Sequence, residues 1–487
     1  MSALHTLAVT ELAAAVARGE LSAVEVAAAY LDRIAAHDGA LHAYLHVDRA
    51  AALQSAAEVD AARLRGEQLG VLAGVPIALK DNLCTRGMPT TCASRILEGY
   101  VPPYDAHVVE RLRAASAVVL GKLNMDEFAM GSSTESSAFG VTRNPWDLER
   151  TPGGSSGGAA AATAARLCAA ALGSDTGGSV RQPASYCGIT AIKPTYGRVS
   201  RYGLVAFASS LDQVGPMARN VRDAARLLSV IAGRDRRDAT SVEHEVSDYE
   251  AQCGKDVARL RVGVVRGALE GCDAAVTAAT EAAFQRLSEL GCELVEVDLP
   301  HTEHAVSVYY LVATAEASSN LARFDGMRYG MRERGLELAE TYRRTRARGF
   351  GPEVKRRIML GTYALSAGYY DAFYLKAAKV RTLIRRDYEL AFERCDVIAG
   401  PTAPTPAFRL GEVTDPLTMY KLDVFTLPPS LAGVPSLATP CGLSPSGLPI
   451  GLQLTAPWLQ EGRLVRLAHA FEQSLALGAA PPMAGEG

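Results

Sequence analysis

Hydrophobic positions in the first 70 residues recur at helical spacing and are interrupted by helix-boundary signals. Ser22 and Glu25 form a capping-box pattern in front of one apolar run. Asp48 is suited to cap a further helix that ends near Gly66. The pattern therefore predicts an N-terminal helical segment over residues 1–70.

Beyond residue 70, short apolar runs alternate with stretches of helical periodicity. The run 77–79 leads directly into Lys80, which predicts a strand that ends at this lysine. The alternation predicts an α/β fold with a single large domain, a mixed β-sheet core flanked by helices, and the segment 1–70 packed on the core of residues 71–487. Further strands are expected at 117–120, 167–172, 260–265, 292–297, 397–399, 436–439 and 450–454.

Composition narrows the class of protein. Hydrophobic residues make up 48% and charged residues 21%, as in ordinary globular proteins, and a net charge of −3 argues against a globally cationic nucleic-acid binder. Nine scattered cysteines without a C-x-x-C pair favour a reducing compartment over disulfides or a zinc site. The longest near-apolar stretch, 159–172, contains Arg166 and is too short to span a membrane. We expect a soluble, cytoplasmic protein with no metal.

Residues 341–394 carry 13 lysine and arginine residues against five acidic residues, a local net charge of +8. Such a run is compatible with solvated helix faces or with a docking surface for an acidic partner or RNA. The charge pattern alone leaves both open.

Two loops are unusually rich in glycine and serine, at residues 151–158 and 173–179. Consecutive glycines let several backbone N–H groups converge on one point, although tight structural turns have the same composition. Neither loop has the lysine of a phosphate-binding P-loop. The first loop satisfies the short G-x-S-x-G pattern, but no histidine lies between His107 and His244 to supply a local base.

Lys80 stands out because lysine is rare in this chain. Only eight of the 50 basic residues are lysine, so arginine is used wherever a plain positive charge suffices. Lysine can lose its proton when buried, whereas arginine effectively cannot. Lys80 is therefore a candidate base, and the alternative is a simple ion pair with Asp81.

Lys80 and the two loops together resemble the amidase signature family. That family has a lysine after a short strand, then G-G-S-S-G-G, then G-[ST]-D-x-G-G-S-x-R, which here is 173–181. The resemblance implies the amidase signature fold and a Ser-Ser-Lys triad. Ser179 would be the nucleophile, Ser155 the bridging serine after a cis peptide bond, and Lys80 the general base.

Four further segments are similar to one branch of this family, the A subunits of glutamyl-tRNA(Gln) amidotransferases. They are residues 193–198, 317–326, 353–358 and 415–420. This resemblance implies glutamine-binding positions at Tyr309, Arg357 and Asp423, for which structural polar contacts are the alternative.

The same resemblance implies hydrolysis of the glutamine side-chain amide through an acyl-ester on Ser179. The ammonia would pass to a partner protein that uses ATP and Mg²⁺ to convert Glu-tRNA(Gln) to Gln-tRNA(Gln). The partners would be subunits B and C in a heterotrimer, with tRNA held mainly by the ATP-using partner. No cofactor is expected in this chain. A stand-alone amidase and a non-catalytic scaffold are the competing functions.

This chemistry makes definite demands on the site. The pKa of Lys80 would have to fall from ~10.4 to roughly 7–8, which corresponds to about 3–4 kcal/mol. The backbone N–H groups of Thr176, Gly177, Gly178 and Ser179 are the expected oxyanion hole. Asp175 and Arg181 flank this loop, and we expect them to hold its shape as an ion pair or through backbone contacts.

Overall fold

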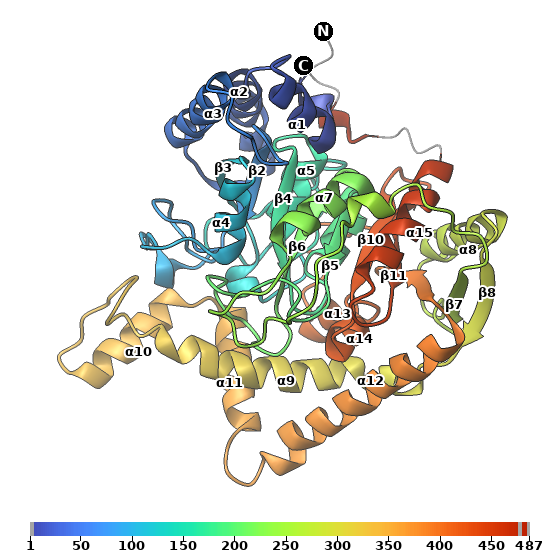
Figure 1. The fold of residues 1–487 in the computed structure, drawn as a ribbon. Coiled ribbons are helices and arrows are strands. Elements are labelled where there is room, and N and C mark those ends of the chain that lie inside the picture. The colour runs from blue at the N-terminus through green and yellow to red at the C-terminus, as the bar shows by residue number, and fades with distance from the viewer. Residues whose placement is uncertain (1–3, 476–479, 485–487) are drawn as a thin grey trace.

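One mixed β-sheet of eleven strands runs through the residues described by the computed structural model, 4–475 and 480–484 (Figure 1). The strands are β1 (Tyr44–Val47), β2 (Pro76–Lys80), β3 (Val118–Leu123), β4 (Ala170–Asp175), β5 (Thr190–Lys193), β6 (Gln213–Ala218), β7 (Arg261–Val265), β8 (Glu293–Val297), β9 (Val397–Pro401), β10 (Ser436–Leu443) and β11 (Pro449–Thr455). Their order across the sheet is β1-β3-β2-β4-β6-β5-β10-β11-β9-β7-β8. The predicted α/β class with a mixed sheet is confirmed.

Helices flank the sheet along the whole chain (Figure 1). They are α1 (Val9–Arg18), α2 (Ala23–Leu41), α3 (Arg49–Leu64), α4 (His107–Ala114), α5 (Gly157–Ala164), α6 (Arg181–Cys187), α7 (Val221–Ile231), α8 (Ala274–Glu289), α9 (Ala305–Asn320), α10 (Leu338–Gly349), α11 (Pro352–Ala364), α12 (Lys376–Arg394), α13 (Pro416–Lys421), α14 (Leu427–Ala432) and α15 (Glu461–Ser474). Helices α4, α7, α15 and α8 pack in a row against the sheet. Within the described residues, none of the helices is both long and apolar enough to cross a membrane.

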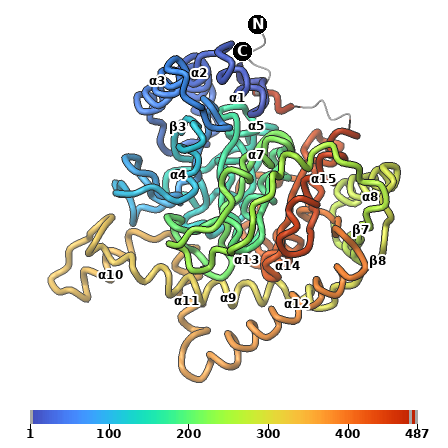
Figure 2. Tube along the Cα trace, viewed as in Figure 1, coloured from blue at the N-terminus to red at the C-terminus, as the bar shows by residue number. Residues whose placement is uncertain are grey.

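The N-terminal segment folds as the capping signals predict. The side chain of Ser22 accepts hydrogen bonds at the start of α2, with Glu25 completing the capping box, and Asp48 caps α3. Strand β1, which the sequence pattern did not reveal, pairs antiparallel with β3 at the edge of the sheet. Figure 2 shows α1 to α3 gathered at one end of the molecule, opposite the chain from α9 to α12. Backbone hydrogen bonds thus join residues 44–47 to the rest of the sheet.

Two further strands, β5 and β6, were not expected, and the predicted loop 173–179 is partly a strand. Strand β4 continues to Asp175 because β6 pairs with it along its whole length. Strand β6 contains Gly215 and Pro216, which carry little strand signal of their own. Pairing with β4 decides this conformation, and the paired residues Asp175 and Gln213 are 38 positions apart in the sequence.

Small residues make α5 an interior helix. Every residue of α5 is buried, and its sequence is GGAAAATA. A Cβ atom added at Gly158 would lie 2.5 Å from the carbonyl oxygen of Asn124, so the helix backbone approaches the preceding segment closely. The near-apolar stretch 159–172 is thus accounted for by this interior helix and the start of β4.

Candidate active site

Lys80 and the loop of Ser179 reach the same edge of the sheet because they follow neighbouring parallel strands. Strand β2 ends at Lys80 and pairs in parallel with β4, with Leu79 beside Leu172. Strand β4 ends at Asp175, where the loop to Ser179 begins. Because parallel strands point their carboxyl ends in one direction, these two segments meet at the same edge of the sheet.

The loop that carries Ser155 enters this meeting point just before α5. The peptide bond between Gly154 and Ser155 is cis, as the family resemblance implies. The Gly154 N–H donates to Gln182 Oε1 at 3.0 Å. A Cβ atom added at Gly154 would lie 2.1 Å from Asp126 Oδ2, so only glycine fits without displacing that carboxylate.

Lys80 is fully buried, and its Nζ atom has three neutral oxygen neighbours. Nζ lies 2.7 Å from Ser155 Oγ, 2.8 Å from Ser156 Oγ and 3.3 Å from the Ser174 carbonyl oxygen. Burial lowers the pKa of Lys80 to about 7, with the more distant charge of Asp126 acting in the opposite direction. The N-terminus of α5, one residue after Ser156, adds a partial positive charge that also disfavours a protonated amine.

The hydrogen-bond roles around Lys80 follow from which oxygen atoms are able to donate. The Ser174 carbonyl only accepts, and Ser156 Oγ donates to it at 3.1 Å. A neutral lysine amine has two hydrogens, and these serve the Ser174 carbonyl and Ser156 Oγ. The lone pair of the amine is then left for Ser155 Oγ, the one neighbour whose hydrogen is not committed elsewhere. The arrangement suits proton transfer from Ser155 to Lys80.

The alternative role of Lys80, an ion pair with Asp81, is wrong. Asp81 instead pairs with Lys122 at 3.3 Å, and both side chains are buried. Lys122 Nζ also donates to the Leu83 carbonyl and to Thr90 Oγ1, each at 2.8 Å. Successive residues of an extended chain point to opposite sides, which separates the side chains of Lys80 and Asp81.

Ser179 lies at the open side of this cluster. It is 7% exposed, whereas Ser155 is fully buried, so an incoming substrate meets Ser179 first. The Ser156 N–H donates to the Ser179 carbonyl at 3.1 Å and ties the two loops together. In the described residues Ser179 Oγ makes no direct hydrogen bond to Ser155. Such contacts between catalytic groups often tighten only when substrate binds.

The expected ion pair between Asp175 and Arg181 is confirmed. The two side chains are fully buried with a separation of 2.9 Å. Burial alone would raise the pKa of Asp175, but the Arg181 charge holds it below its usual value. Asp175 Oδ1 also accepts the Gly178 N–H at 2.8 Å. The pair therefore braces the loop from its inner side.

Three of the four expected oxyanion-hole donors are without an acceptor. Across the described part of the chain, the N–H groups of Thr176, Gly177 and Ser179 form no hydrogen bond, whereas that of Gly178 is taken by Asp175. The Gly177 carbonyl accepts from Thr426 Oγ1 at 2.6 Å, which orients the peptide plane between Gly177 and Gly178.

The three expected substrate-binding residues come together from distant parts of the chain. Tyr309 lies on α9, Arg357 on α11, and Asp423 follows α13; all three are buried. A Cβ atom added at Gly177 would lie 2.7 Å from Tyr309 Cζ, so the tyrosine ring packs on the Ser179 loop. Burial raises the pKa of Tyr309, the charge of Arg357 lowers it, and the charge of Asp423 raises it further. The three groups form one electrostatic cluster beside this loop.

Arg357 has one edge occupied and one edge available. Its Nε donates to Glu353 at 2.8 Å. The guanidinium carbon lies 5.2 Å from the ring centroid of Tyr310, 5.4 Å from that of Tyr420 and 5.7 Å from that of Phe207. Its two Nη groups donate to no acceptor in the described residues. A buried guanidinium with unused donors is suited to bind a carboxylate.

Asp423 is the complementary anion. Its Oδ2 accepts from Ser132 Oγ at 2.5 Å, and its buried Oδ1 has no hydrogen-bond partner in the described residues. Burial raises the pKa of Asp423 to about 7, while the hydrogen bond from Ser132 and the charge of Arg357 act in the opposite direction. An unsatisfied buried carboxylate oxygen calls for a cationic or donating partner.

Three residues of this region had no role predicted from the sequence: Ser156, Glu353 and Ser132. Ser156 lies inside the Gly/Ser motif, where the family resemblance assigns a role only to its neighbour Ser155. Glu353 lies one helical turn before Arg357, a spacing that the sequence alone shows. No local signal marks Ser132, because it is 291 positions from Asp423.

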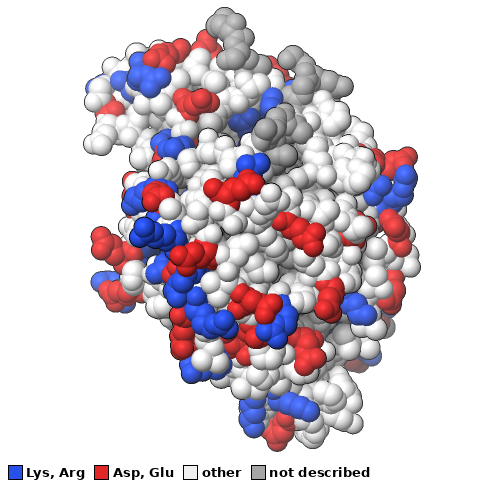
Figure 3. All heavy atoms as spheres, turned by 90° about the vertical axis from the view of Figure 1, so that its right-hand side faces the viewer, with Lys and Arg blue, Asp and Glu red and all other residues white. Residues whose placement is uncertain are grey.

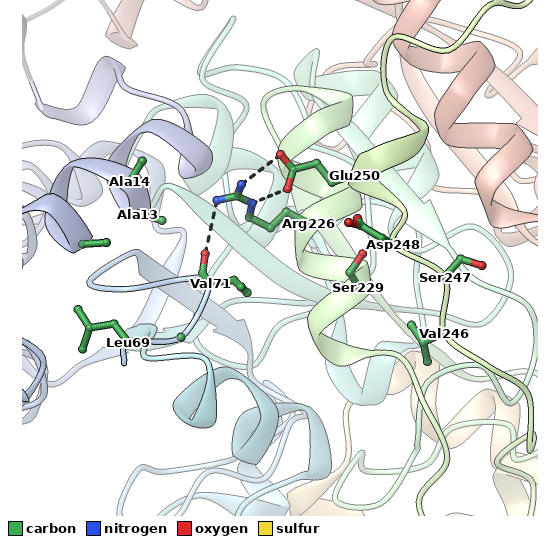
Figure 4. A pocket seen from close by; sticks show the side chains of 12 residues that line it. Ala13, Ala14, Leu69, Val71, Arg226, Ser229, Val246, Ser247, Asp248 and Glu250 are labelled. Carbon is green, nitrogen blue, oxygen red and sulfur yellow. Dashed lines mark hydrogen bonds and ion pairs between the residues drawn. The ribbon is translucent and has the colours of Figure 1, made fainter. Parts of the chain in front are cut away.

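A separate surface groove of about 580 Å³ lies between α1, residues 69–71 and α7. Arg226 lines this groove and donates to Glu250 at 2.7 Å and to the Val71 carbonyl at 3.5 Å (Figure 4). The groove shares no lining residue with the Lys80 cluster. Among the described residues, histidine, cysteine and acidic side chains form no group that could hold a metal ion.

The basic stretch 341–394 forms α10, α11 and α12. Part of its charge is balanced within the helices, since Arg356 pairs with Glu353 and Arg385 pairs with Glu389. The outer side of α11 also exposes apolar side chains, including 71% of Met359. Elsewhere, on the face beyond β7 and β8 in Figure 3, basic and acidic side chains are interspersed.

Comparison with known proteins identifies relatives of this chain. The family model described as Amidase matches residues 25–465. The chain belongs to the amidase family. One curated relative, the A subunit of the glutamyl-tRNA(Gln) amidotransferase of Moorella thermoacetica, is 60% identical over 475 residues, which is 97% of each chain.

Solved amidase structures share the fold over almost the whole chain. The crystal structure of the glutamyl-tRNA(Gln) amidotransferase A subunit from Thermotoga maritima has a TM-score of 0.81 at 43% identity and covers 97% of this chain and 96% of its own. The native peptide amidase from Stenotrophomonas maltophilia has a TM-score of 0.83 at 32% identity and covers 97% of this chain and 98% of its own. A peptide amidase and one component of a tRNA-dependent amidotransferase are thus both built on this amidase fold.

Proposed function

We propose that this chain hydrolyses the side-chain amide of glutamine as the ammonia-supplying subunit of a tRNA-dependent amidotransferase. The observation that carries the proposal is a basic and an acidic group beside the Ser179 loop, each of which keeps hydrogen-bonding atoms without a partner in the described residues. The Nη groups of Arg357 suit the α-carboxylate of a free amino acid, and Asp423 Oδ1 suits its α-ammonium. The 60% identity to the A subunit of Moorella thermoacetica supports the wider assembly.

Acylation begins with the transfer of two protons along the buried chain of groups. Ser155 Oγ gives its proton to the neutral Lys80 amine and takes the proton of Ser179 Oγ, which attacks the amide carbon of glutamine. A bond from Ser179 Oγ to this carbon forms, and the carbonyl oxygen becomes an oxyanion. When the carbon–nitrogen bond breaks, the proton returns through Ser155 to the leaving nitrogen, and ammonia departs.

Deacylation uses the same groups in the same order. A water molecule replaces ammonia, loses its proton through Ser155 to Lys80, and attacks the ester carbon. Collapse of this second oxyanion breaks the ester bond, and the proton returns to Ser179 Oγ. The products are glutamate and the free enzyme.

The N–H groups of Thr176, Gly177 and Ser179 are the proposed donors to both oxyanions. One such donor is typically worth about 2.7–4 kcal/mol of barrier. Because the Asp175–Arg181 pair and Thr426 hold the loop before substrate arrives, little reorganisation is needed when the negative charge develops.

The rest of the proposed reaction belongs to partner subunits. ATP and Mg²⁺ would activate Glu-tRNA(Gln) on a B subunit, a small C subunit would complete the heterotrimer, and tRNA would be held mainly by the B subunit in the cytoplasm. The outer side of α11 and α12 exposes apolar and basic side chains. Such a surface supports docking of a protein partner, because the core of a protein–protein interface is enriched in apolar side chains.

A stand-alone amidase is the second candidate, and the similarity to peptide amidase favours it. A peptide amide substrate has no free α-carboxylate at the reacting residue, which would leave the buried Arg357 unused. The two functions are separated by comparing glutamine with a peptide amide as substrate of the purified chain and of the reconstituted heterotrimer. Hydrolysis of the peptide amide but not of glutamine would reject the proposal.

The decisive experiment measures glutamine-dependent formation of Gln-tRNA(Gln) by the heterotrimer. We expect Ser179→Ala to abolish this activity, and ammonium chloride in place of glutamine to restore it, because only the ammonia supply is lost. Unchanged glutamine-dependent activity in Ser179→Ala would instead favour a non-catalytic scaffold.

A further inference from the structure

Glu353 links the two halves of the proposed glutamine-binding cluster. Its Oε1 accepts from Arg357 Nε at 2.8 Å and from the Tyr420 hydroxyl at 2.9 Å. Its Oε2 accepts from Arg356. Arg357 and Glu353 lie one turn apart on α11, whereas Tyr420 belongs to α13, three residues before Asp423. One carboxylate thus connects the arginine side of the cluster to the segment that carries the aspartate.

Aromatic rings complete the support of Arg357. The rings of Tyr310 and Tyr420 stack with a centroid separation of 3.7 Å, and the guanidinium lies against both. Burial would raise the pKa of Glu353, but the charge and the hydrogen bond of Arg357 hold it below its usual value. A charged Glu353 therefore compensates the buried guanidinium before any substrate is present.

We propose that Glu353 is a positioning residue for substrate recognition, which holds Arg357 by its Nε so that both Nη groups remain for the substrate carboxylate. The proposal rests on the proposed function, in which that carboxylate belongs to glutamine. Through Tyr420, Glu353 also sets the spacing between the groups that bind the α-carboxylate and the α-ammonium. Glu353 makes no contact with Lys80, Ser155 or Ser179, so its effect is on binding.

The test uses the reconstituted heterotrimer and measures glutaminase kinetics. Glu353→Ala removes a charge-assisted hydrogen bond, and we expect the KM for glutamine to rise about 10- to 100-fold with kcat within about twofold. Glu353→Gln keeps an acceptor oxygen and should give a smaller rise. Tyr420→Phe, which removes only one of the bonds to Glu353, should raise KM by the least.

Two controls separate positioning from a general structural effect. Glu289→Ala also removes an ion pair within a helix, with Arg286 on α8 at 2.9 Å, but both of its members are exposed and lie outside the proposed docking surface, and KM should not change. In an Arg357→Ala background, Glu353→Ala should add a further rise in KM no larger than that of Tyr420→Phe, because its main effect is exerted through that arginine.

Calorimetric titration of glutamine into the Ser179→Ala heterotrimer gives a readout that does not depend on turnover. The dissociation constant should rise with Glu353→Gln as KM does. An unchanged KM and dissociation constant in the folded Glu353 variants, or a full additional rise in the Arg357→Ala background, would overturn the positioning role. Failure of the unsubstituted heterotrimer to hydrolyse glutamine would instead reject the proposed function and with it the substrate assigned here.

Discussion

Two fully buried lysines on neighbouring strands have opposite surroundings. Lys80 ends β2, and Lys122 lies on β3 beside Leu79. Lys122 has a carboxylate at 3.3 Å, that of Asp81, and three further oxygen acceptors. Lys80 has two serine hydroxyls and one carbonyl. The same side chain, at the same burial, is an ion-pair partner in one place and a candidate base in the other.

The difference shows that burial is not the only factor that decides whether a lysine can act as a base. Desolvation disfavours the charged form of any buried amine, and a nearby carboxylate reverses this preference. The carboxylates of Asp126, Asp175 and Asp212 act on Lys80 only through longer-range charge, and burial prevails. The absence of a contacting anion is therefore as important to the proposed chemistry as the presence of the serines.

The largest expected effect comes from substituting the lysines by arginine. Lys80→Arg should lower glutaminase turnover by about 10²–10⁴-fold, because the guanidinium does not release its proton. Steady-state rates of the purified heterotrimer measure this, with circular dichroism to establish the fold. Lys122→Arg is the matched control and should keep most of the activity, since a permanent cation still pairs with Asp81. Near-normal turnover in Lys80→Arg would remove Lys80 from the role of base.

The free energy of unfolding should respond in the reverse order, with the larger loss on substitution of Lys122. Lys122→Met leaves the buried Asp81 carboxylate without its partner and should lower the free energy of unfolding by about 3–5 kcal/mol. Lys80→Met should be neutral or stabilising at pH 7 and below. The folded state lowers the pKa of Lys80 from 10.5 to about 7, so burying it costs most below pH 7 and progressively less as the pH rises to 10.5. Urea unfolding at pH 6.5 and 9 measures the free energy of unfolding of both variants. Equal losses of stability in the two variants would show that the surroundings of the two lysines do not differ in this way.

The pH profile of glutamine hydrolysis sharpens the comparison. Since Lys80 must be neutral, kcat should rise about tenfold per pH unit below 7 and level off above it. Asp423, with a pKa of about 7, must be charged to bind the ammonium, so kcat/KM should fall more steeply than kcat on acidification. Asp423→Asn should remove that extra steepness. A kcat that stays constant from pH 5.5 to 8 would contradict a neutral-lysine mechanism.

The smallest effect concerns the direction of the Lys80 lone pair. Ser156→Ala removes one acceptor of the amine, so the lone pair is no longer reserved for Ser155, and we expect kcat to fall about tenfold with KM unchanged. Ser156→Thr keeps the hydroxyl and should retain more activity if its methyl group is accommodated. Equal kcat for the alanine variant and the unsubstituted enzyme would show that Ser156 does not orient the amine.

Much of the fold was predictable wherever the signals are local. The cap residues Ser22 and Asp48 lie within three residues of the backbone groups that they bind. The strand before Lys80 is a continuous apolar run, as expected for a strand buried on both faces. Strands β5 and β6 were missed because their conformation depends on pairing with distant strands, and β6 includes both glycine and proline.

The candidate site divides in the same way. By itself, the sequence determined that a rare lysine follows a strand and that two glycine-rich loops carry serines, because composition and spacing are properties of the chain. Only the tertiary structure decided that Asp81 pairs with Lys122, that Lys80 is left among hydroxyls, and that Asp423 keeps an unsatisfied oxygen beside Arg357. The physical reason is that charge compensation and desolvation depend on neighbours contributed by other strands and helices, and chain folding alone brings these into contact.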